Sequence, residues 1–350
     1  MESFTLIRPR SLDAARTRAL GAEGTQSERL YRAGGIDLLD LLKEKLIKPS
    51  ELIELRALRD AHGEAMRALG IIGGRWHLGA LSTLAAIHSS DLPEAFAALQ
   101  EAAGSAATPS IRNSATLGGN LLQRPRCWYF RHRDLHCLKK GGGRCLAEGA
   151  ENKFHAILGG GPCHIVHPST LAVALVALRA ELVIVGESED KDKSRDKNKV
   201  STFRTIPIES LFALPRVDPH REHTLAPGDV IREVVLPEPF SDQRSVYEVA
   251  KEKQSCDWPL AEVAISLSLR GGTIHDIRVG LGHVAPTPWR AVEFEEALEG
   301  QRPSAELFAR VVPLATQGAH PLGENAYKIP LTQGLCRSAL HRICAVDVPD

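Results

Sequence analysis

Four of the chain's seven cysteines lie in one stretch directly after a glycine-rich run, and this pattern constrains the fold more than any other feature. Cys127, Cys137, Cys145 and Cys163 follow the segment ATLGGN at 115–120. A thiol-rich segment beside a glycine-rich loop is typical of a redox protein that holds a metal centre close to a nucleotide-like cofactor. The sequence therefore predicts a metal centre in this stretch.

The spacing of these four cysteines bears on the kind of metal. Structural zinc sites usually separate paired ligands by two to four residues, because one tight knuckle then supplies half of a tetrahedron. Here the gaps are nine, seven and seventeen residues. A [4Fe-4S] cluster needs four cysteines and tolerates irregular spacing when a loop wraps it. The spacing favours an iron–sulfur cluster, with zinc and unrelated buried thiols as the alternatives.

A disulfide framework is not expected, because the number of cysteines is odd and the first twenty residues have no apolar core of a signal sequence. The charged residues of this N-terminal stretch include Glu2, Arg8, Arg10 and Asp13. The lack of a signal on this chain leaves both cytoplasm and periplasm open, because a partner subunit can carry the export signal for a folded complex. The remaining cysteines, Cys256, Cys336 and Cys344, are expected to fill small apolar roles without binding metal.

The composition of the cysteine-rich segment suits an anionic cluster. Trp128, Tyr129 and Phe130 follow Cys127 directly and could shield it from water, in a chain with only 5% aromatic residues. Asp134 is the only acidic residue between 124 and 144, whereas seven are basic: Arg124, Arg126, Arg131, Arg133, Lys139, Lys140 and Arg144. Positive charge stabilises a cluster with four thiolates. A solvated basic loop or a docking surface for a partner subunit is the alternative.

Composition and length limit the remaining possibilities. The 43 Lys and Arg residues balance 43 Asp and Glu residues, whereas nucleic-acid-binding domains are usually strongly basic. With 350 residues and 43% hydrophobic residues, the chain can bury large cores in two or three domains. No apolar run approaches the roughly 20 residues that span a bilayer, so we expect a soluble chain.

Two glycine pairs are candidates for cofactor-binding loops. Gly34 and Gly35 stand between a predicted strand and a predicted helix, where a residue without Cβ lets backbone N–H groups approach a phosphate. Taken alone, this first pair is better explained by an ordinary strand-to-helix turn. Around the second pair, Thr116, Gly118, Gly119 and Asn120 offer a hydroxyl, bare N–H groups and a carboxamide, which suit a pyrophosphate or a flavin edge.

The rest of the chain shows a capped helix, a charged segment and a separate α+β unit. Ser169 or Thr170 is the predicted N-cap of a buried helix. The charged segment 186–199 is expected to be a solvated hairpin tip or a disordered loop. A strand over 231–236 ends at a proline, and 237–243 reads as an interdomain linker. After the linker we expect strands near 244–252, 260–270 and 274–282, then helices near 289–298, 304–317 and 332–343.

Five motifs, taken in their order along the chain, resemble the FAD-binding medium subunit of the molybdenum hydroxylases, the xanthine dehydrogenase and carbon monoxide dehydrogenase flavoprotein family. They are AGGIDLLDLLK (33–43), TPSIRNSATLGGNLLQ (108–123), HPSTLAVALVAL (167–178), the strand that ends in Leu236-Pro237, and VGLGHVAPTPWRA (279–291). The cysteine pattern RCWYFR…C…C…HAILGGGPC between the second and third motifs resembles one branch of the family. That branch is typified by the periplasmic aldehyde oxidoreductase, whose flavin subunit carries an additional [4Fe-4S] cluster.

The resemblance implies an α+β fold of two parts. The first is a two-lobed FAD-binding domain of the vanillyl-alcohol oxidase (PCMH) type over 1–237, with lobes 1–58 and 59–237 and an iron–sulfur insertion at about 124–166. The second is a smaller C-terminal α+β domain of the CO dehydrogenase flavoprotein type over 243–350. FAD is expected to lie extended between the lobes, with its flavin facing the C-terminal domain.

The resemblance also implies the site residues. Those expected to bind FAD are Ala33, Gly34, Gly35, Ile36, Asp37 and Leu38 in the first loop, Thr108, Thr116, Gly118, Gly119, Asn120 and Gln123 around the second, and Thr170, Ile231 and Trp258 elsewhere. All four clustered cysteines, Cys127, Cys137, Cys145 and Cys163, are expected to hold the cluster. The chain departs from the family at Thr170, where an Asp is usual, and at Val249, where a Lys is frequent; Lys251 or Lys253 could substitute.

The role implied by the family is electron transfer within a heterotrimer. A small subunit with [2Fe-2S] clusters would pass electrons to a non-covalent FAD on this chain, and FAD would pass them to an external acceptor. A large subunit with molybdenum cofactor would hydroxylate an aldehyde or an N-heterocycle, so no catalytic residue is assigned here. Two other classes compete: a structural zinc-binding interaction module, and a stand-alone NAD(P)H-dependent flavin reductase, although the chain has no strand–GxGxxG–helix unit.

Overall fold

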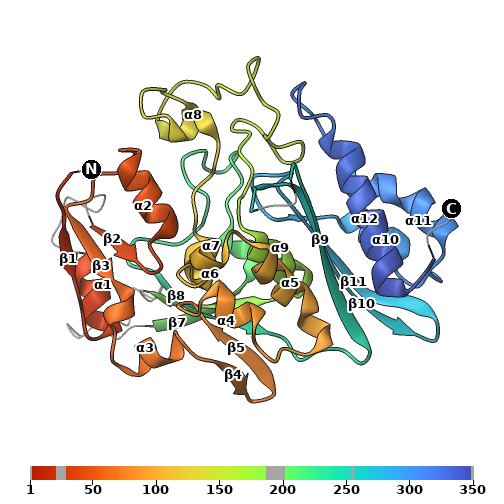
Figure 1. The fold of residues 1–350 in the computed structure, drawn as a ribbon, viewed down its shortest axis with the longest axis horizontal. Coiled ribbons are helices and arrows are strands. Elements are labelled where there is room, and N and C mark those ends of the chain that lie inside the picture. The colour runs from red at the N-terminus through yellow and green to blue at the C-terminus, as the bar shows by residue number, and fades with distance from the viewer. Residues whose placement is uncertain (1, 21–28, 187–201, 254–255, 348–350) are drawn as a thin grey trace, which may run out of the picture.

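The chain forms three sheets with helices packed between and beside them (Figure 1). The computed structural model describes residues 2–20, 29–186, 202–253 and 256–347. Apart from Gly186, the charged segment for which we expected a hairpin tip or a disordered loop lies outside the described residues. No helix in the described ranges is long and apolar enough to cross a membrane.

The N-terminal sheet has three parallel strands, β1 (Thr5–Ile7), β3 (Glu51–Glu54) and β2 (Arg29–Arg32), with β3 in the centre. Helix α1 (Leu12–Leu20) lies between β1 and β2 in the chain. Helix α2 (Ile36–Lys43) follows β2 and forms the crossover to β3, as neighbouring parallel strands require. The first glycine pair thus lies between the end of β2 and the start of α2.

The middle sheet is antiparallel, and its five strands come from segments far apart in the chain. Its order is β4 (Leu69–Ile72), β5 (Arg75–Gly79), β8 (Val230–Leu236), β6 (Glu181–Gly186) and β7 (Thr202–Pro207). The strand predicted over 231–236 is β8, which pairs with both β5 and β6. Short elements join these strands to their neighbours: η2 (Leu55–Ala57), α3 (Ala61–Ala65) and η6 (Ile208–Leu211).

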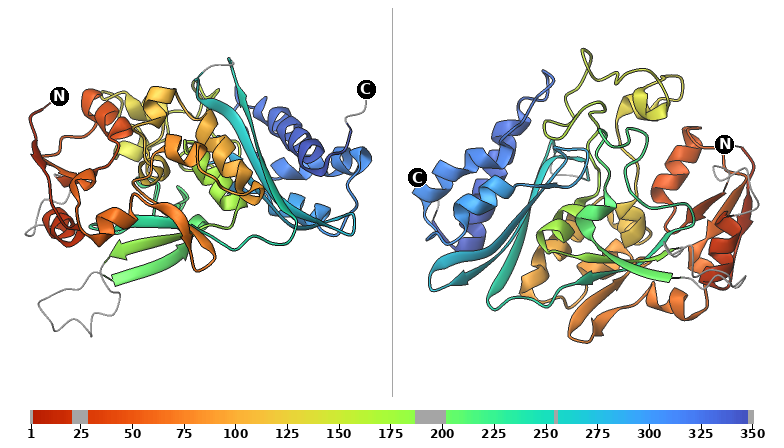
Figure 2. Two further views of the ribbon diagram at one scale, coloured as in Figure 1. Left: turned by 60° about the horizontal axis from the view of Figure 1, so that its bottom comes forward. Right: turned by 180° about the vertical axis from the view of Figure 1, so that it is seen from behind.

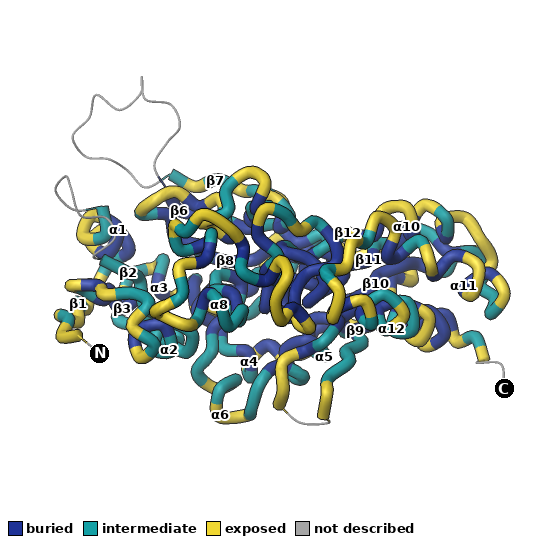
Figure 3. Tube along the Cα trace, turned by 90° about the horizontal axis from the view of Figure 1, so that it is seen from above, coloured by how far each residue is buried: buried dark blue, intermediate teal, exposed yellow. Residues whose placement is uncertain are grey.

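A layer of helices covers the middle sheet and forms the largest core. It contains α4 (Leu84–His88), η3 (Glu94–Phe96), α5 (Ala97–Ser105), α6 (Pro109–Arg112), α7 (Leu117–Leu121) and α9 (Thr170–Ala177). Every residue of α9 is buried, as predicted for a capped core helix, and the Ser169 hydroxyl accepts the Ala172 N–H at 3.1 Å. Figure 3 shows this buried centre between more exposed ends.

The C-terminal part is a four-stranded antiparallel sheet covered by helices on one face. The predicted strands are β9 (Gln243–Lys251), β10 (Pro259–Arg270) and β11 (Thr273–Gly282), joined by the short β12 (Trp289–Arg290). The predicted helices are α10 (Val292–Leu298), α11 (Ala305–Val311) with η7 (Val312–Thr316), and α12 (Lys328–Cys344), which begins four residues earlier than expected.

Alternation along β10 lets this sheet serve two cores. Val263 and Ile265 point into the C-terminal core, whereas Ala264 between them belongs to the central core, because successive strand residues face opposite sides. Helix α9 therefore packs against the face of β10 and β11 that the C-terminal helices leave free.

The cysteine-rich segment is mostly irregular and contains only α8 (Trp128–Arg131) and η4 (Leu138–Lys140) as helical turns. It runs above the central helices, between α2 and α12 (Figures 1 and 2). The C-terminal part holds it by side-chain hydrogen bonds: Lys328 donates to the carbonyl of Phe154 at 3.0 Å, and Asn325 donates to those of His155 and Ala156. A segment with so little regular structure thus takes its position from contacts with its neighbours.

Candidate cofactor site

One cavity of about 660 Å³ lies between the N-terminal sheet, the central helices and the loop before β10. All fifteen residues expected to bind FAD line it: Ala33, Gly34, Gly35, Ile36, Asp37, Leu38, Thr108, Thr116, Gly118, Gly119, Asn120, Gln123, Thr170, Ile231 and Trp258. Five separate stretches of the chain thus meet around one space. Its size fits a large, elongated ligand with both apolar and polar parts.

Each residue of the first glycine pair needs to be glycine for a different structural reason. Gly35 has a φ of 78°, which favours glycine, and it stands directly before α2. A Cβ on Gly34 would lie 2.3 Å from the carbonyl oxygen of Ser114, so the backbone leading to the second loop packs directly on Gly34. The two glycine loops are therefore in contact, and a side chain at Gly34 would push them apart.

The two residues of the second glycine pair also differ in their surroundings. Gly118 is buried, and its N–H donates to the carbonyl of Ala80 at 2.8 Å. This hydrogen bond holds α7 against the end of β5. Gly119 is exposed, and only Thr116 Oγ1, which accepts its N–H, would come close to an added Cβ. Of the two, Gly119 is the glycine at which a side chain would enter the cavity.

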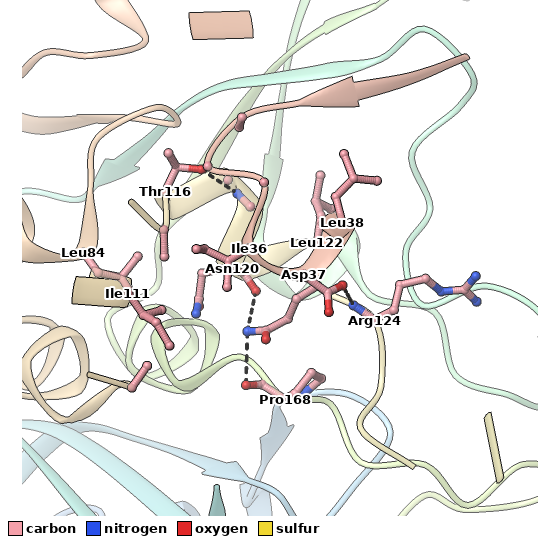
Figure 4. A pocket seen from close by; sticks show the side chains of 18 of the residues that line it. Ile36, Asp37, Leu38, Leu84, Ile111, Thr116, Asn120, Leu122, Arg124 and Pro168 are labelled. Carbon is pink, nitrogen blue, oxygen red and sulfur yellow. Dashed lines mark hydrogen bonds between the residues drawn. The ribbon is translucent and has the colours of Figure 1, made fainter. Parts of the chain in front are cut away.

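Polar side chains hold the far end of α7 to the start of α9. The Ser169 hydroxyl donates to Asn120 Oδ1 at 2.6 Å. Gln123 Nε2 donates to the carbonyls of the labelled residues Asn120 and Pro168 (Figure 4). Thr170, at the position where the family usually has Asp, is only 6% exposed at this junction. The wall is therefore fixed by hydrogen bonds within the chain.

Asp37 lines the cavity, but its carboxylate is already committed to the cysteine-rich segment. It accepts the backbone N–H of Arg124 at 2.9 Å and pairs with Arg131 at 2.7 Å and with Arg126 at 3.0 Å (Figure 4). Burial lowers the pKa of Arg126, and its Nε has no hydrogen-bond partner among the residues that the structure describes. Sequence reasoning treated Asp37 as part of a loop around the ligand and missed these three arginines.

The loop before β10 closes the cavity from the C-terminal side. The Arg126 guanidinium lies 4.6 Å from the centre of the Trp258 ring, which is 49% exposed. Of the two lysines considered as substitutes at Val249, Lys251 lines the cavity and donates to the carbonyl of Ser105 at 2.8 Å, whereas Lys253 does not line it.

The other cavity residues that sequence reasoning missed fall into two groups. Some directly precede predicted residues, as do Ser105, Ala106 and Ala107 before Thr108, so a wider window around each motif would have found them. Others, including Tyr31, His223 and Asp229, carry no motif and are brought in by the fold alone.

The four clustered cysteines, Cys127, Cys137, Cys145 and Cys163, meet around a second and much smaller cavity of about 10 Å³. His155 also lines this thiol cavity, and its Nε2 lies 3.2 Å from Cys127 Sγ. Burial raises the pKa of Cys127 to about 11, while a hydrogen bond from Cys163 lowers the pKa of Cys145. In the described part of the chain, no three or more His, Cys, Asp or Glu side chains form a site for a single metal ion.

A buried group of three charges stands beside the thiol cavity. The Lys139 ammonium, with its side chain only 1% exposed, pairs with Glu222 at 2.9 Å, and Arg124 pairs with the same carboxylate at 3.0 Å. Burial alone would raise the pKa of Glu222, but these two cations hold it below its usual value. Two cations share one anion, so this group leaves excess positive charge next to the thiols, which suits an anionic group.

The remaining cysteines fit the sequence prediction only in part. Cys336 and Cys344 are buried in the C-terminal core, which confirms the expected apolar role. Cys256 is exposed and lines the large cavity, so the prediction of a small core residue was wrong there. Trp258 and Pro259, which follow Cys256 closely in the chain, line the same cavity.

Comparison with known proteins gives the same two-part organisation. A family model described as the FAD binding domain in molybdopterin dehydrogenase matches residues 2–239, and one described as the CO dehydrogenase flavoprotein C-terminal domain matches residues 245–343. The predicted α+β fold, with an FAD-binding part and this C-terminal part, is confirmed.

Two curated relatives align over nearly the whole chain. The aldehyde oxidoreductase FAD-binding subunit PaoB of Escherichia coli K12 is 32% identical and covers 97% of this chain and 98% of its own. The carbon monoxide dehydrogenase medium chain of Hydrogenophaga pseudoflava is 22% identical and covers 97% and 96%.

Solved structures share the fold at lower identity. Quinoline 2-oxidoreductase from Pseudomonas putida 86 aligns with a TM-score of 0.71 at 19% identity, over 98% of both chains. The carbon monoxide dehydrogenase of Hydrogenophaga pseudoflava aligns with the same TM-score at 24% identity, again over 98% of both chains.

Proposed function

The chain belongs to the FAD-binding medium subunits of the molybdenum hydroxylases, and on this premise we propose that it is the electron-transfer subunit of a heterotrimeric oxidoreductase. In this role it takes electrons from the [2Fe-2S] clusters of a small partner subunit and releases them to an external acceptor. Hydroxylation occurs at the molybdenum cofactor of a large partner subunit. The relatives named as medium chains support the presence of such partners.

One observation carries the FAD assignment: fifteen residues from five separate stretches, chosen from sequence, line a single cavity. Bound FAD supplies reversible electron uptake and release, and the chain's own residues bind and orient it. Gly34 and Gly35 leave the backbone at the start of α2 open to the diphosphate, where N–H groups favour negative charge. Gly119 gives a second close approach, and Trp258 covers the flavin ring.

The thiol cavity is proposed to hold one [4Fe-4S] cluster through all four of its cysteines, Cys127, Cys137, Cys145 and Cys163. Two features support this: the four thiols line one cavity with apolar neighbours, and the excess positive charge beside Lys139 suits an anionic cluster. His155 is in position to hydrogen-bond the Cys127 sulfur, which is a common way for a protein to tune a cluster. Zinc remains the alternative metal, and analysis of the metal decides between them.

The substrate of the whole complex is proposed to be an aldehyde or an N-heterocycle. The similarity to an aldehyde oxidoreductase subunit supports the aldehyde, and the shared fold of the quinoline 2-oxidoreductase is consistent with the N-heterocycle. We also propose that residues 1–237 form the FAD-binding domain, with the cysteine-rich insertion at about 124–166, and that 243–350 form the C-terminal domain.

The test is the cofactor content of the full-length chain produced together with its partner subunits. We expect one non-covalent FAD per chain, released by denaturation, and four iron atoms per chain. A colourless protein that contains zinc would replace the proposal with a structural zinc-binding module. Rapid reduction of the flavin by NAD(P)H in the isolated chain, with no partner present, would replace it with a stand-alone flavin reductase.

A further inference from the structure

Helix α2, which forms one wall of the large cavity, is held by the cysteine-rich segment through charged contacts. Asp37 in its first turn meets three arginines, Arg124, Arg126 and Arg131, from both sides of Cys127. Further along α2, Arg131 also pairs with Glu44 at 3.1 Å. We call this group of side chains the arginine clasp: Arg124, Arg126 and Arg131 with Asp37, Asp40 and Glu44.

Apolar side chains also join α2 to the cysteine-rich segment. Leu41 of α2 forms a small core with Phe130 and Cys137 of the cysteine-rich segment, bordered by Leu46, Ile47, Cys127, Tyr129 and Leu146. Neither Leu41 nor Leu42 belongs to the central core. Among the described helices and strands, none makes an extensive contact with α2. The position of α2 is therefore set mainly by the cysteine-rich segment.

The arginine clasp also offsets the negative charge of Asp37 at the cavity wall. A carboxylate in the first turn of α2 would repel an anionic ligand at the helix start, but three guanidinium or N–H partners surround Asp37 and offset its charge. Arg126 itself lines the cavity and lies over Trp258, so one side chain contacts the N-terminal helix, the ligand space and the C-terminal loop.

We infer that the cysteine-rich segment is a structural part of the FAD site, with Arg131 as the positioning residue that holds α2 against the cofactor. The inference rests on the proposed function for the identity of the ligand. Arg131 suits this role because its planar guanidinium reaches Asp37 and Glu44 together, and its side chain is only 10% exposed. Because binding linkage is reciprocal, order in the segment tightens FAD binding and FAD orders the segment.

The first experiment measures FAD affinity of the flavin-stripped, full-length chain by fluorescence titration. Arg131→Met keeps the apolar stem and removes the guanidinium, and we expect its dissociation constant to rise about tenfold, within the usual range of coupling between sites. Arg133→Met is the matched control, because Arg133 is 55% exposed and pairs only with its neighbour Asp134 among the ion pairs described; its affinity should change less than twofold. Arg131→Lys keeps the positive charge but lacks the planar guanidinium that reaches two carboxylates. Its dissociation constant for FAD should lie between those of Arg131→Met and Arg133→Met.

The second experiment uses the wild-type chain and does not depend on how any variant folds. Hydrogen exchange is followed with and without FAD, and FAD should slow exchange across residues 124–146 but not across α11, which lies in the C-terminal core. A wild-type chain that takes up no FAD overturns the proposed function. FAD binding with unchanged exchange at 124–146, or with equal affinity in a folded Arg131→Met chain, overturns this inference and leaves the function intact.

Discussion

The large cavity takes its walls from segments as distant in the chain as Ala33 and Trp258, whereas the thiol cavity takes all its cysteines from one stretch, 127–163. The first is about 660 Å³ and its shape depends on glycines against which backbone packs directly. The second is about 10 Å³ and is closed by side chains and buried charges. Substitutions that add a side chain at a glycine should therefore damage the large cavity most. Substitutions that change the chemistry of a side chain should damage the thiol cavity most.

The largest expected effect tests the backbone side of this comparison. Changing Gly118 and Gly119 together to Val should give protein without bound FAD, because a Cβ at Gly118 would meet Ala80 at 3.2 Å and a side chain at Gly119 would enter the cavity. FAD is measured after denaturation. Gly70→Val in β4, where an added Cβ meets nothing within 4 Å, is the control and should keep its FAD. Full flavin content in the double variant would refute the assignment of the second loop.

To separate local damage from ligand exclusion, Gly119→Val is also made alone. An added Cβ at Gly119 would meet only the Thr116 hydroxyl, at 2.9 Å, so this variant should lower the melting temperature of the flavin-free chain less than the double variant does and still lose FAD. A single variant with normal FAD would mean that the double variant acts only through packing at Gly118.

The second effect concerns the thiol cavity. Cys137→Ser should lose nearly all iron and destabilise the chain or its docking, because Cys137 also belongs to the small core with Leu41 and Phe130. The cluster is expected to be structural or a side relay, so assembled complexes should still reduce the acceptor. A rate at least a hundredfold lower with FAD retained, equivalent to about 2.7 kcal/mol of added barrier, would instead make the cluster an in-line carrier. A variant with full iron would overturn the ligand set.

A third and smaller effect tests the buried charges. Glu222→Gln leaves Lys139 and Arg124 without their shared anion and should cost about 3 kcal/mol of unfolding free energy near neutral pH. In the wild type the folded pKa of Glu222 lies below its usual value of 4.5, so its stabilisation is complete above that value and is lost as the pH falls toward the folded pKa. Denaturant titrations from pH 7 to pH 3 should show a weaker acid dependence in the variant; equal slopes would contradict this account.

The smallest expected effect comes from Cys256→Ser. Cys256 is exposed at the edge of the large cavity and does not line the thiol cavity, so iron content should stay unchanged and FAD affinity should change less than twofold. The triple variant that also changes Cys336 and Cys344 should keep its iron, although the two core substitutions will lower stability. Iron near zero in that triple variant would mean that the wrong thiols were chosen.

Sequence reasoning performed best where a pattern reports local structure. The start of the capped helix α9 and the bounds of the strands β8 to β11 were predicted to within one or two residues, because their periodicity, caps and prolines act over short distances. The strands β3, β4, β5 and β7 were not predicted. They are short or partly exposed, and their pairing with strands far away in the chain decides their structure.

By itself the sequence determined the family, the glycines that need to lack a side chain, and the grouping of the four thiols, because each depends on residue types at short spacing. Only the tertiary structure decided that Asp37 faces three arginines, that Glu222 joins Arg124 to Lys139, and that Cys256 reaches the large cavity. These partners are brought together by irregular segments. Such segments have no periodicity from which the direction of a side chain can be read, and their path is fixed by the packing around them.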